Sequence, residues 1–136
     1  MKEFTAKQLL KKVEQDYNLI ADEFSQTRQW LWPEFDNFKK YVKNGQTILD
    51  LGCGNGRLYE LLKNLQDFKY IGIDNNKKFV QLAKKKFKSA KFLYGNALSI
   101  PYSDKVDILF YIASFHHIPS KKLRIKFLKE KIFLFL

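Results

Sequence analysis

The stretch TILDLGCGNG, residues 47–56, decides the fold expected for this chain. An apolar run leads into a loop with glycine at every second position, Gly52, Gly54 and Gly56, and these are three of the six glycines in the sequence. Because ordering a glycine costs backbone entropy, three together indicate positive φ angles or a molecule packed against bare backbone. Leucines with the helical spacing i, i+3, i+4, i+7 follow from Leu58 onward. The loop therefore joins a strand to a helix, which is where α/β proteins bind nucleotide-like ligands.

The spacing of these glycines separates the loop from two other nucleotide-binding loops. The dinucleotide fingerprint G-x-G-x-x-G would need a glycine where Arg57 stands, and the Gly-Lys-Ser/Thr ending of a P-loop is absent. The seven residues DLGCGNG instead resemble the first motif of the class I methyltransferases, which use S-adenosyl-L-methionine (SAM). The resemblance implies that the three loop glycines bind SAM. The alternative is a strand-to-helix turn that holds no ligand.

Length and composition indicate one folded domain. We expect residues 1–136 to form a single methyltransferase-like domain, with a helical prelude at 1–44 and a SAM-binding α/β core at 45–136. A hydrophobic content of 46% and an aromatic content of 16% exclude general disorder. The formal net charge of +11 favours polyanionic partners such as nucleic acid, although lysines on helices also serve as a solvated face.

Several classes of protein are not supported by the sequence. No apolar run approaches the roughly 18 residues that span a bilayer, and the N-terminus lacks the apolar core of a signal peptide. The single Cys53 agrees with a reducing compartment, and we interpret it as a small residue fitting a tight loop. One cysteine and two adjacent histidines give no usual metal-ligand spacing. We therefore expect a cytoplasmic protein without a metal site or a membrane partner.

Helices and strands are predicted along the whole chain. The prelude reads as three helices, with apolar positions at 9–13, at 17–24 and, after Pro33, at 35–42. Strands at 47–51, 70–73, 91–94 and 106–113 alternate with helices at 56–65, 76–87 and from about 119. Alternation of this kind predicts a parallel, doubly wound sheet. The apolar ending at 132–136 is either a stunted fifth strand or the end of a truncated chain.

The class I resemblance assigns SAM-binding roles beyond the glycine loop. Asp74 ends the second predicted strand, 22 residues after Gly52, where a carboxylate accepts hydrogen bonds from both ribose hydroxyls; the alternative is the N-cap of the next helix. Asn96 and Ala97 would flank the adenine, or Asn96 is a turn former. Asp50 would orient the methionine ammonium, or would accept hydrogen bonds from N–H groups of the loop. Ile112 or Ala113 would lie beneath the cofactor.

A second resemblance involves the prelude. Residues 17–28, YNLIADEFSQTR, followed by Trp32-Pro33, resemble the Y-x-x-I-A-x-x-F-S-x-T-R…W-P signature of enzymes that methylate the carboxymethyl group on the wobble uridine of tRNA. Residues 112–117, IASFHH, are similar to the segment after the fourth strand in that family. The resemblance implies a Rossmann-like parallel sheet of the class I methyltransferase type, with an N-terminal helical segment but without the usual C-terminal strands. It also implies a tRNA substrate and often a small activating protein subunit.

The same resemblance suggests roles for residues near the substrate. Arg28 offers a planar fork for a carboxylate, either of SAM or of the substrate, and Tyr17 would close over the methionine moiety. His116 and His117 would line the substrate mouth. The alternatives are helix packing for Tyr17, a surface ion pair for Arg28 and a polar turn for the histidines. We expect carboxyl methylation of tRNA, with a small-molecule methyltransferase or a truncated SAM-binding protein without catalysis as alternatives.

Overall fold

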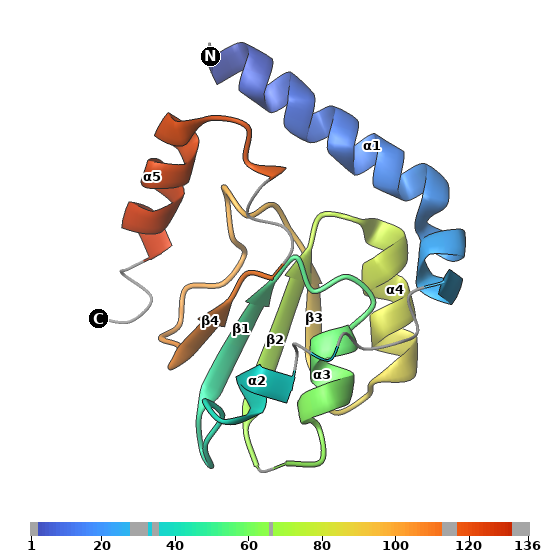
Figure 1. Ribbon diagram of the computed structural model, residues 1–136, viewed down its shortest axis with the longest axis vertical. Coiled ribbons are helices and arrows are strands. Elements are labelled where there is room, and N and C mark those ends of the chain that lie inside the picture. Colours follow the sequence, from blue (N-terminus) through green and yellow to red (C-terminus); the bar gives the residue numbers. More distant parts are fainter. Residues whose placement is uncertain (1–2, 28–32, 34–35, 66, 113–116, 132–136) are drawn as a thin grey trace.

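The computed structural model describes residues 3–27, 33, 36–65, 67–112 and 117–131, and for residues 3, 22–27 and 130–131 it describes the backbone alone. Figure 1 shows one sheet with helices on both sides. The four described strands are β1 (Thr47–Leu51), β2 (Lys69–Asp74), β3 (Lys91–Tyr94) and β4 (Ile108–Phe110). They lie in the order β3-β2-β1-β4, and every neighbouring pair is parallel. The prediction of a Rossmann-like parallel sheet is confirmed.

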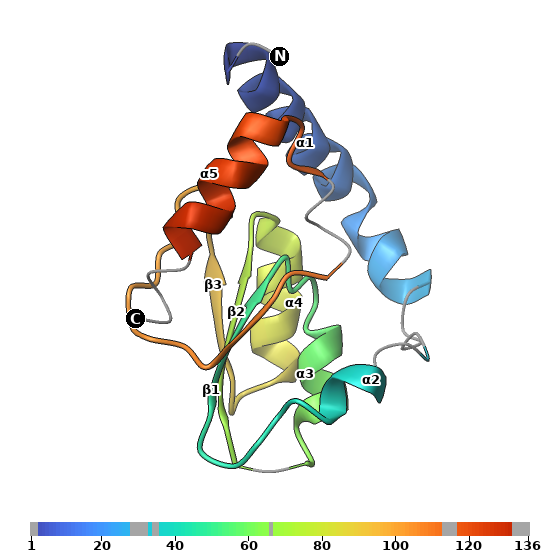
Figure 2. The same cartoon turned by 60° about the vertical axis from the view of Figure 1, so that its left-hand side comes forward.

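The five described helices follow the predicted alternation in the core but not in the prelude. They are α1 (Glu3–Thr27), α2 (Asp36–Lys39), α3 (Arg57–Leu62), α4 (Lys77–Lys86) and α5 (Lys121–Lys131). Figures 1 and 2 show α3 and α4 on one side of the sheet and α5 on the other, with α1 running across the end of the sheet where β1 and β2 finish. None of the helices in the described part of the chain has the length and apolar character needed to cross a bilayer.

The side chains of β1 and β2 alternate between two apolar clusters. Ile48 and Tyr70 face the cluster beneath α3 and α4, whereas Leu49 and Ile71 face the cluster beneath α5. This period of two is what a sheet covered on both faces requires. Asp50 falls on the α3–α4 side, in the same alternation as Ile48 and Tyr70. A carboxylate is therefore placed inside an otherwise apolar layer.

The prelude was predicted incorrectly in three respects. The two helices expected at 9–13 and 17–24 are one continuous helix, α1, because no Gly or Pro interrupts residues 3–27. Ile20, expected on the buried stripe, is 45% exposed, whereas Ala6 and Ala21 are fully buried. The third helix is reduced to the four residues of α2, and Val42 is buried beyond its end.

Two elements in the core are shorter than predicted. The fourth strand covers only Ile108–Phe110, and α3 ends at Leu62. On α5, where Leu123, Phe127 and Leu128 were predicted to form the apolar face, Leu123 and Phe127 are buried. Leu128 is 56% exposed, because the next residue on a helix is turned about 100° away from Phe127. The predicted strand or truncated ending at 132–136 lies outside the described residues.

Candidate functional site

A pocket opens at the carboxyl ends of the strands, on the side that α1 covers. It has a volume of about 180 Å³ and takes residues from the loops after β1, β2 and β3, from the end of β4 and from α1. This is the position at which open α/β sheets bind ligands. The predicted site residues that line it are Tyr17, Asp50, Gly52, Gly54, Asp74, Asn96, Ala97, Ile112 and His117.

The glycine loop has the backbone conformation that its sequence predicted. Gly52, Gly54 and Gly56 have φ angles of 71°, 56° and 90°, in the left-handed region that side chains disfavour. A Cβ at Gly56 would lie 2.8 Å from the ring of Phe87, so this position lacks both the backbone freedom and the space for another residue. A Cβ at Gly54 would meet nothing within 4 Å. The loop therefore presents bare backbone at Gly54, on the lining of the pocket.

Asp74 joins the glycine loop to the end of β2. Its Oδ2 accepts a hydrogen bond from the Gly54 N–H at 2.8 Å, and its Oδ1 accepts one from the Asn76 N–H at 2.8 Å. Since each carboxylate oxygen has two lone pairs, both oxygens keep acceptor capacity. Burial raises the pKa of Asp74, and the N–H bonds counter part of that rise. The N-cap alternative for Asp74 is wrong, because Asn76 caps α4.

Asn76 is a site residue that sequence reasoning considered only as a helix start. Its Oδ1 accepts from the Phe79 N–H at 3.1 Å, which is the capping bond. Its side chain is buried and lines the pocket, and its Nδ2 has no partner among the described residues. A buried donor without a partner costs about 1–3 kcal/mol, and an acceptor on a bound ligand would remove that cost.

Asp50 is held by a contact that the sequence did not predict. Asp50 is 3% exposed, and its carboxylate accepts a hydrogen bond from the hydroxyl of Tyr70. Tyr70 lies on β2, two residues before Gly72, which is the register partner of Asp50. Burial, offset partly by the Tyr70 bond, raises the pKa of Asp50 to about 7. Among the described residues, the group that donates to Asp50 is the Tyr70 hydroxyl. The alternative, in which Asp50 accepts hydrogen bonds from N–H groups of the loop, is therefore wrong.

The turn after β3 contributes Asn96 and Ala97 to the pocket wall. The Asn96 Oδ1 accepts from the Leu98 N–H at 2.9 Å, and the Asn96 carbonyl accepts from the Ser99 N–H at 2.9 Å. Asn96 is thus a turn former, as one of the two predictions had it. Its side-chain oxygen keeps a second lone pair, so the turn does not preclude contact with a ligand.

Helix α1 forms a roof over the pocket. Leu10, Val13 and Tyr17 line it, and the Tyr17 hydroxyl lies 3.2 Å from Nε2 of His117, a residue 100 positions later in the sequence. The two rings meet edge to face, with centroids 5.6 Å apart. Tyr17 is therefore in contact with the segment after β4 and does not serve helix packing alone. One turn earlier on α1, Glu14 accepts a hydrogen bond from the Tyr94 hydroxyl at 3.1 Å.

Not every predicted site residue can be placed. Arg28, Ala113 and His116 lie outside the described residues. Conversely, the pocket is also lined by Phe79 and Tyr111, which the sequence suggested only as core residues. Burial and the nearby Asp74 raise the pKa of Tyr111 to about 12, so its hydroxyl keeps its proton at neutral pH. Within the described ranges no group of three or more His, Cys, Asp or Glu side chains is arranged to hold a metal ion.

Similarity to curated proteins extends over the prelude as well as the core. The chain is 35% identical over 121 residues to the mouse tRNA (carboxymethyluridine(34)-5-O)-methyltransferase ALKBH8, a match that covers 88% of this chain and 18% of that protein. It is 31% identical over 119 residues to the tRNA (carboxymethyluridine(34)-5-O)-methyltransferase of Schizosaccharomyces pombe, covering 87% of this chain and 50% of that protein. The chain thus spans half or less of these relatives. The resemblance drawn from the sequence motifs is confirmed.

Solved structures share the fold. The [4+2]-cyclase SpnF superposes with a TM-score of 0.72 at 18% identity, over 88% of this chain and 54% of that one. A SAM-dependent methyltransferase from Methanosarcina mazei superposes with a TM-score of 0.63 at 28% identity, over 78% of this chain and 53% of that one. Residues 48–131, more than half of the chain, match the family model for a methyltransferase domain. This protein therefore belongs to the methyltransferase-domain family, and its parallel sheet is of the class I type.

Proposed function

We propose that this chain binds SAM and methylates the carboxymethyl group on the wobble uridine of tRNA. One observation carries the substrate assignment: the match to the mouse tRNA methyltransferase covers 88% of the chain, whereas the predicted α/β core from residue 45 onward is only about two thirds of it. The similarity therefore extends into α1, the helix that roofs the pocket. A generic SAM-binding core would not require that helix.

The residues around the pocket fit SAM. Asp74 keeps acceptor capacity on both oxygens, as needed for two ribose hydroxyls, and the unpaired Asn76 Nδ2 is a donor for a ring nitrogen or oxygen. The bare backbone at Gly54 allows close approach of the amino-acid end. Asn96 and Ala97 would flank the adenine, and Ile112 would lie near the sulfonium, as the resemblance implies.

Asp50 would orient the methionine ammonium. In the buried layer the carboxyl has a pKa of about 7, so ionisation is only partly complete at neutral pH. A cationic ammonium near it favours the charged form. Binding of the ammonium group would therefore make the ionisation of Asp50 complete, while the Tyr70 hydroxyl fixes the position of the carboxylate.

For methyl transfer to a carboxylate, the main task of the protein is to position the carboxylate against the methyl group. When bound, SAM supplies an electrophilic methyl group, and a carboxylate acceptor is already ionised because its pKa is about 4. No general base is needed, and orientation alone contributes roughly 7–11 kcal/mol in well-aligned reactions. Tyr17 on α1 would close over the methionine moiety of SAM, and we assign the substrate side to His117, Arg28 and His116.

A small activating protein is a further proposed partner. A solved complex of the Haloferax volcanii Trm112 methyltransferase activator with a putative methyltransferase shares the fold, with a TM-score of 0.64 at 21% identity, over 81% of this chain and 52% of that one. By analogy we propose that residues 1–136 form one domain that acts together with such a subunit. The reaction would be assayed with and without it.

Calorimetric titration with SAM tests the cofactor assignment. We expect Asp74→Ala to weaken SAM binding about 100-fold or more, since two hydrogen bonds to a charged group are worth about 1.5–3 kcal/mol each. Asp104→Ala is the matched control, because this carboxylate is exposed and does not line the pocket. Equal affinities of Asp74→Ala and the control would refute the cofactor assignment.

Transfer of labelled methyl from SAM to tRNA tests the substrate assignment. We expect transfer to tRNA that carries carboxymethyluridine and none to unmodified tRNA, because the carboxylate is the nucleophile. SAM binding with transfer to a small acid, but not to tRNA, would favour the small-molecule alternative. SAM binding without any transfer, even with an activating subunit, would favour a SAM-binding protein without catalysis.

A further inference from the structure

One helix that lines the pocket, α1, and one that follows a lining segment, α5, each have a stretch with basic side chains and no acidic ones. Residues 4–13 of α1 include three lysines and no Asp or Glu. Residues 119–129, at the start of α5, include four lysines and Arg124, again without Asp or Glu. The chain has a net charge of +11, and all 14 of its acidic residues lie outside these two segments.

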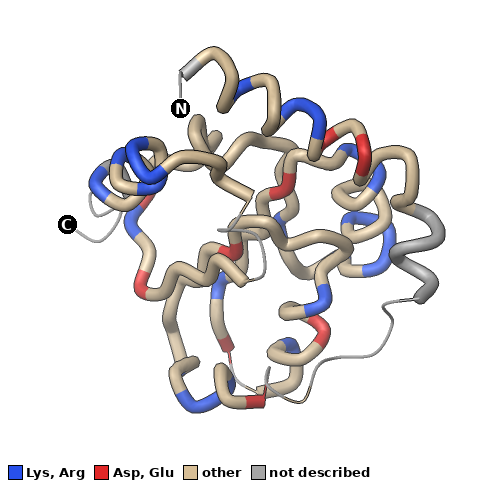
Figure 3. The backbone as a smooth tube through the Cα atoms, turned by 45° about the horizontal axis from the view of Figure 1, so that its top comes forward, with Lys and Arg blue, Asp and Glu red and all other residues tan. Residues whose placement is uncertain are grey.

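Packing brings these two segments together. Ala6 of α1 is fully buried in the same apolar cluster as Leu123 and Phe127 of α5. Because Leu123 and Phe127 face inward at spacing i, i+4, the lysines between and beside them face outward. Figure 3 shows Lys and Arg along α5 and along the N-terminal half of α1, at the same end of the molecule. The exposed lysines used below are Lys11, Lys12, Lys121, Lys122 and Lys129.

The basic surface lies directly beside the pocket. Leu10 and Val13, which flank Lys11 and Lys12, line the pocket from α1. His117 and Ile118 line it from the segment that leads into α5 at Lys121. Lysines thus lie beside the opening on two sides, although α1 also carries Glu14 and Asp16 between its lining residues Val13 and Tyr17. The floor carries the carboxylates of Asp50 and Asp74.

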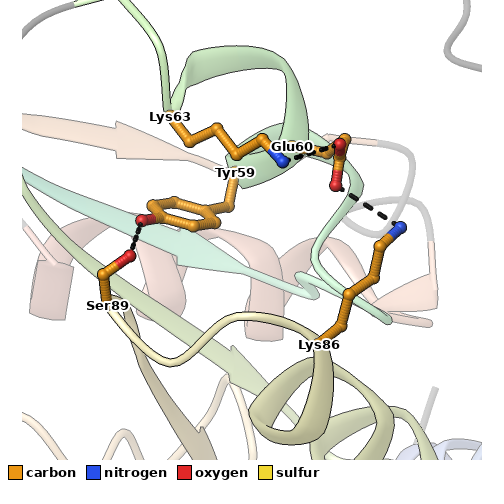
Figure 4. Close-up of polar contacts among 5 residues, drawn as sticks. All are labelled: Tyr59, Glu60, Lys63, Lys86 and Ser89. Atoms are coloured by element: carbon orange, nitrogen blue, oxygen red, sulfur yellow. Dashed lines mark hydrogen bonds and ion pairs between the residues drawn. The ribbon is translucent and has the colours of Figure 1, made fainter.

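A second group of lysines provides a contrast. Lys84, Lys85 and Lys86 form the last turn of α4, whose N-cap Asn76 lines the pocket. Ten helical residues span about 15 Å, so these lysines lie at the far end of the helix. Figure 4 shows that Lys86 pairs with Glu60 at 3.4 Å, and that Glu60 also binds Lys63 at 2.9 Å. This end of the molecule uses its charges partly to join α3 to α4.

We propose that the exposed lysines of α1 and α5 form a docking surface for RNA phosphates on either side of the nucleotide that enters the pocket. This assignment rests on the proposed function, because it takes the RNA to be the methyl acceptor. Charge complementarity favours a polyanion, and the concave pocket beside the two basic segments favours a strand that inserts one nucleotide. A flat anionic membrane lying on both helices would instead seal the opening.

Two triple variants with the same change in charge test the surface. Lys121→Gln/Lys122→Gln/Lys129→Gln removes three charges beside the pocket, and Lys84→Gln/Lys85→Gln/Lys88→Gln removes three exposed charges far from it. The probe is a fluorescent anticodon stem-loop with carboxymethyluridine, bound at salt concentrations between about 50 and 200 mM. We expect the first variant to weaken binding about 10–100-fold and to reduce the salt slope by about 2, since each phosphate contact contributes roughly 0.7–0.9. The control should change binding less than about 3-fold.

Further measurements separate the possible failures. Circular dichroism melts and SAM titration of both variants establish that fold and cofactor site are intact. Equal loss of RNA binding in the two variants, or no loss in either, would overturn the proposal even if tRNA methylation is found. Loss of binding to phosphatidylserine vesicles, with RNA binding unchanged, would assign the surface to a membrane. Selective loss of RNA binding without any methyl transfer would support the docking surface and refute the proposed reaction.

Discussion

The floor and the roof of the pocket are built in different ways. The floor is made within one strand–helix–strand unit, β1-α3-β2, where Asp74 binds the N–H of Gly54 only 20 positions earlier in the sequence. The roof is made by Tyr17 and His117, which are 100 positions apart. A local unit is specified by its own turn residues, whereas a long-range contact depends on how α1 packs across the finished sheet. We therefore expect changes in the floor to affect folding as well as SAM binding, and changes in the roof to affect mainly binding.

The largest effect is expected from Gly56→Ala, in the glycine loop that supports the floor. A φ angle of 90° is strained for alanine, and the new Cβ would lie 2.8 Å from the Phe87 ring. We expect urea unfolding to show a loss of about 2–5 kcal/mol, from backbone strain plus overpacking. Gly45→Ala is the matched control, since its φ is 78° but nothing lies within 4 Å of the added Cβ. If both variants lose the same free energy of unfolding, the contact between the added methyl group and Phe87 does not destabilise the fold.

The second effect concerns the pH dependence of stability through Asp50. Its folded pKa of about 7 lies above the unfolded value of about 3.9, so the folded state holds a proton that the unfolded state releases between those pH values. Unfolding therefore becomes more favourable as pH rises from about 4 to about 7, by a few kcal/mol, and the dependence levels off above that range.

Comparison with Asp50→Asn isolates this contribution. Asparagine resembles the protonated carboxyl and does not titrate, whereas the other groups titrate in both proteins. We expect the unfolding free energy of the unsubstituted protein, minus that of the variant, to fall between pH 4 and pH 8. A difference that stays constant over this range would show that the Asp50 pKa is near its ordinary value.

The sequence predicted the floor far better than the roof. The alternation of glycines and the carboxylate at the end of β2 are local signals. The structure places Gly52, Gly54 and Asp74 on the lining of one pocket, whereas Gly56 packs against Phe87. The Tyr70–Asp50 bond was missed because an aromatic residue in an apolar strand reads as core packing. The two short helices predicted in the prelude are one helix, since periodic apolar positions do not reveal that a polar stretch between them remains helical. Tyr17 and His117 were both predicted as site residues, but only the packed structure brings their side chains together.

The smallest effect on stability is expected from Tyr17→Phe in the roof. This change removes the hydroxyl that lies 3.2 Å from His117 Nε2 and leaves the ring contacts with His117 and Phe79. A single hydrogen bond of this kind contributes about 0.5–1.5 kcal/mol, so the unfolding free energy should fall by about 1 kcal/mol or less. If the bond orders α1 over the pocket, SAM affinity should fall by up to about 10-fold, measured by calorimetry. Tyr94→Phe is the control for the same helix. It removes the hydroxyl of Tyr94 on β3 that donates to Glu14 of α1, and neither residue lines the pocket. Equal SAM affinities in the two variants would mean that α1 covers the pocket without the Tyr17–His117 contact, and that the roof is held by its apolar residues Leu10 and Val13.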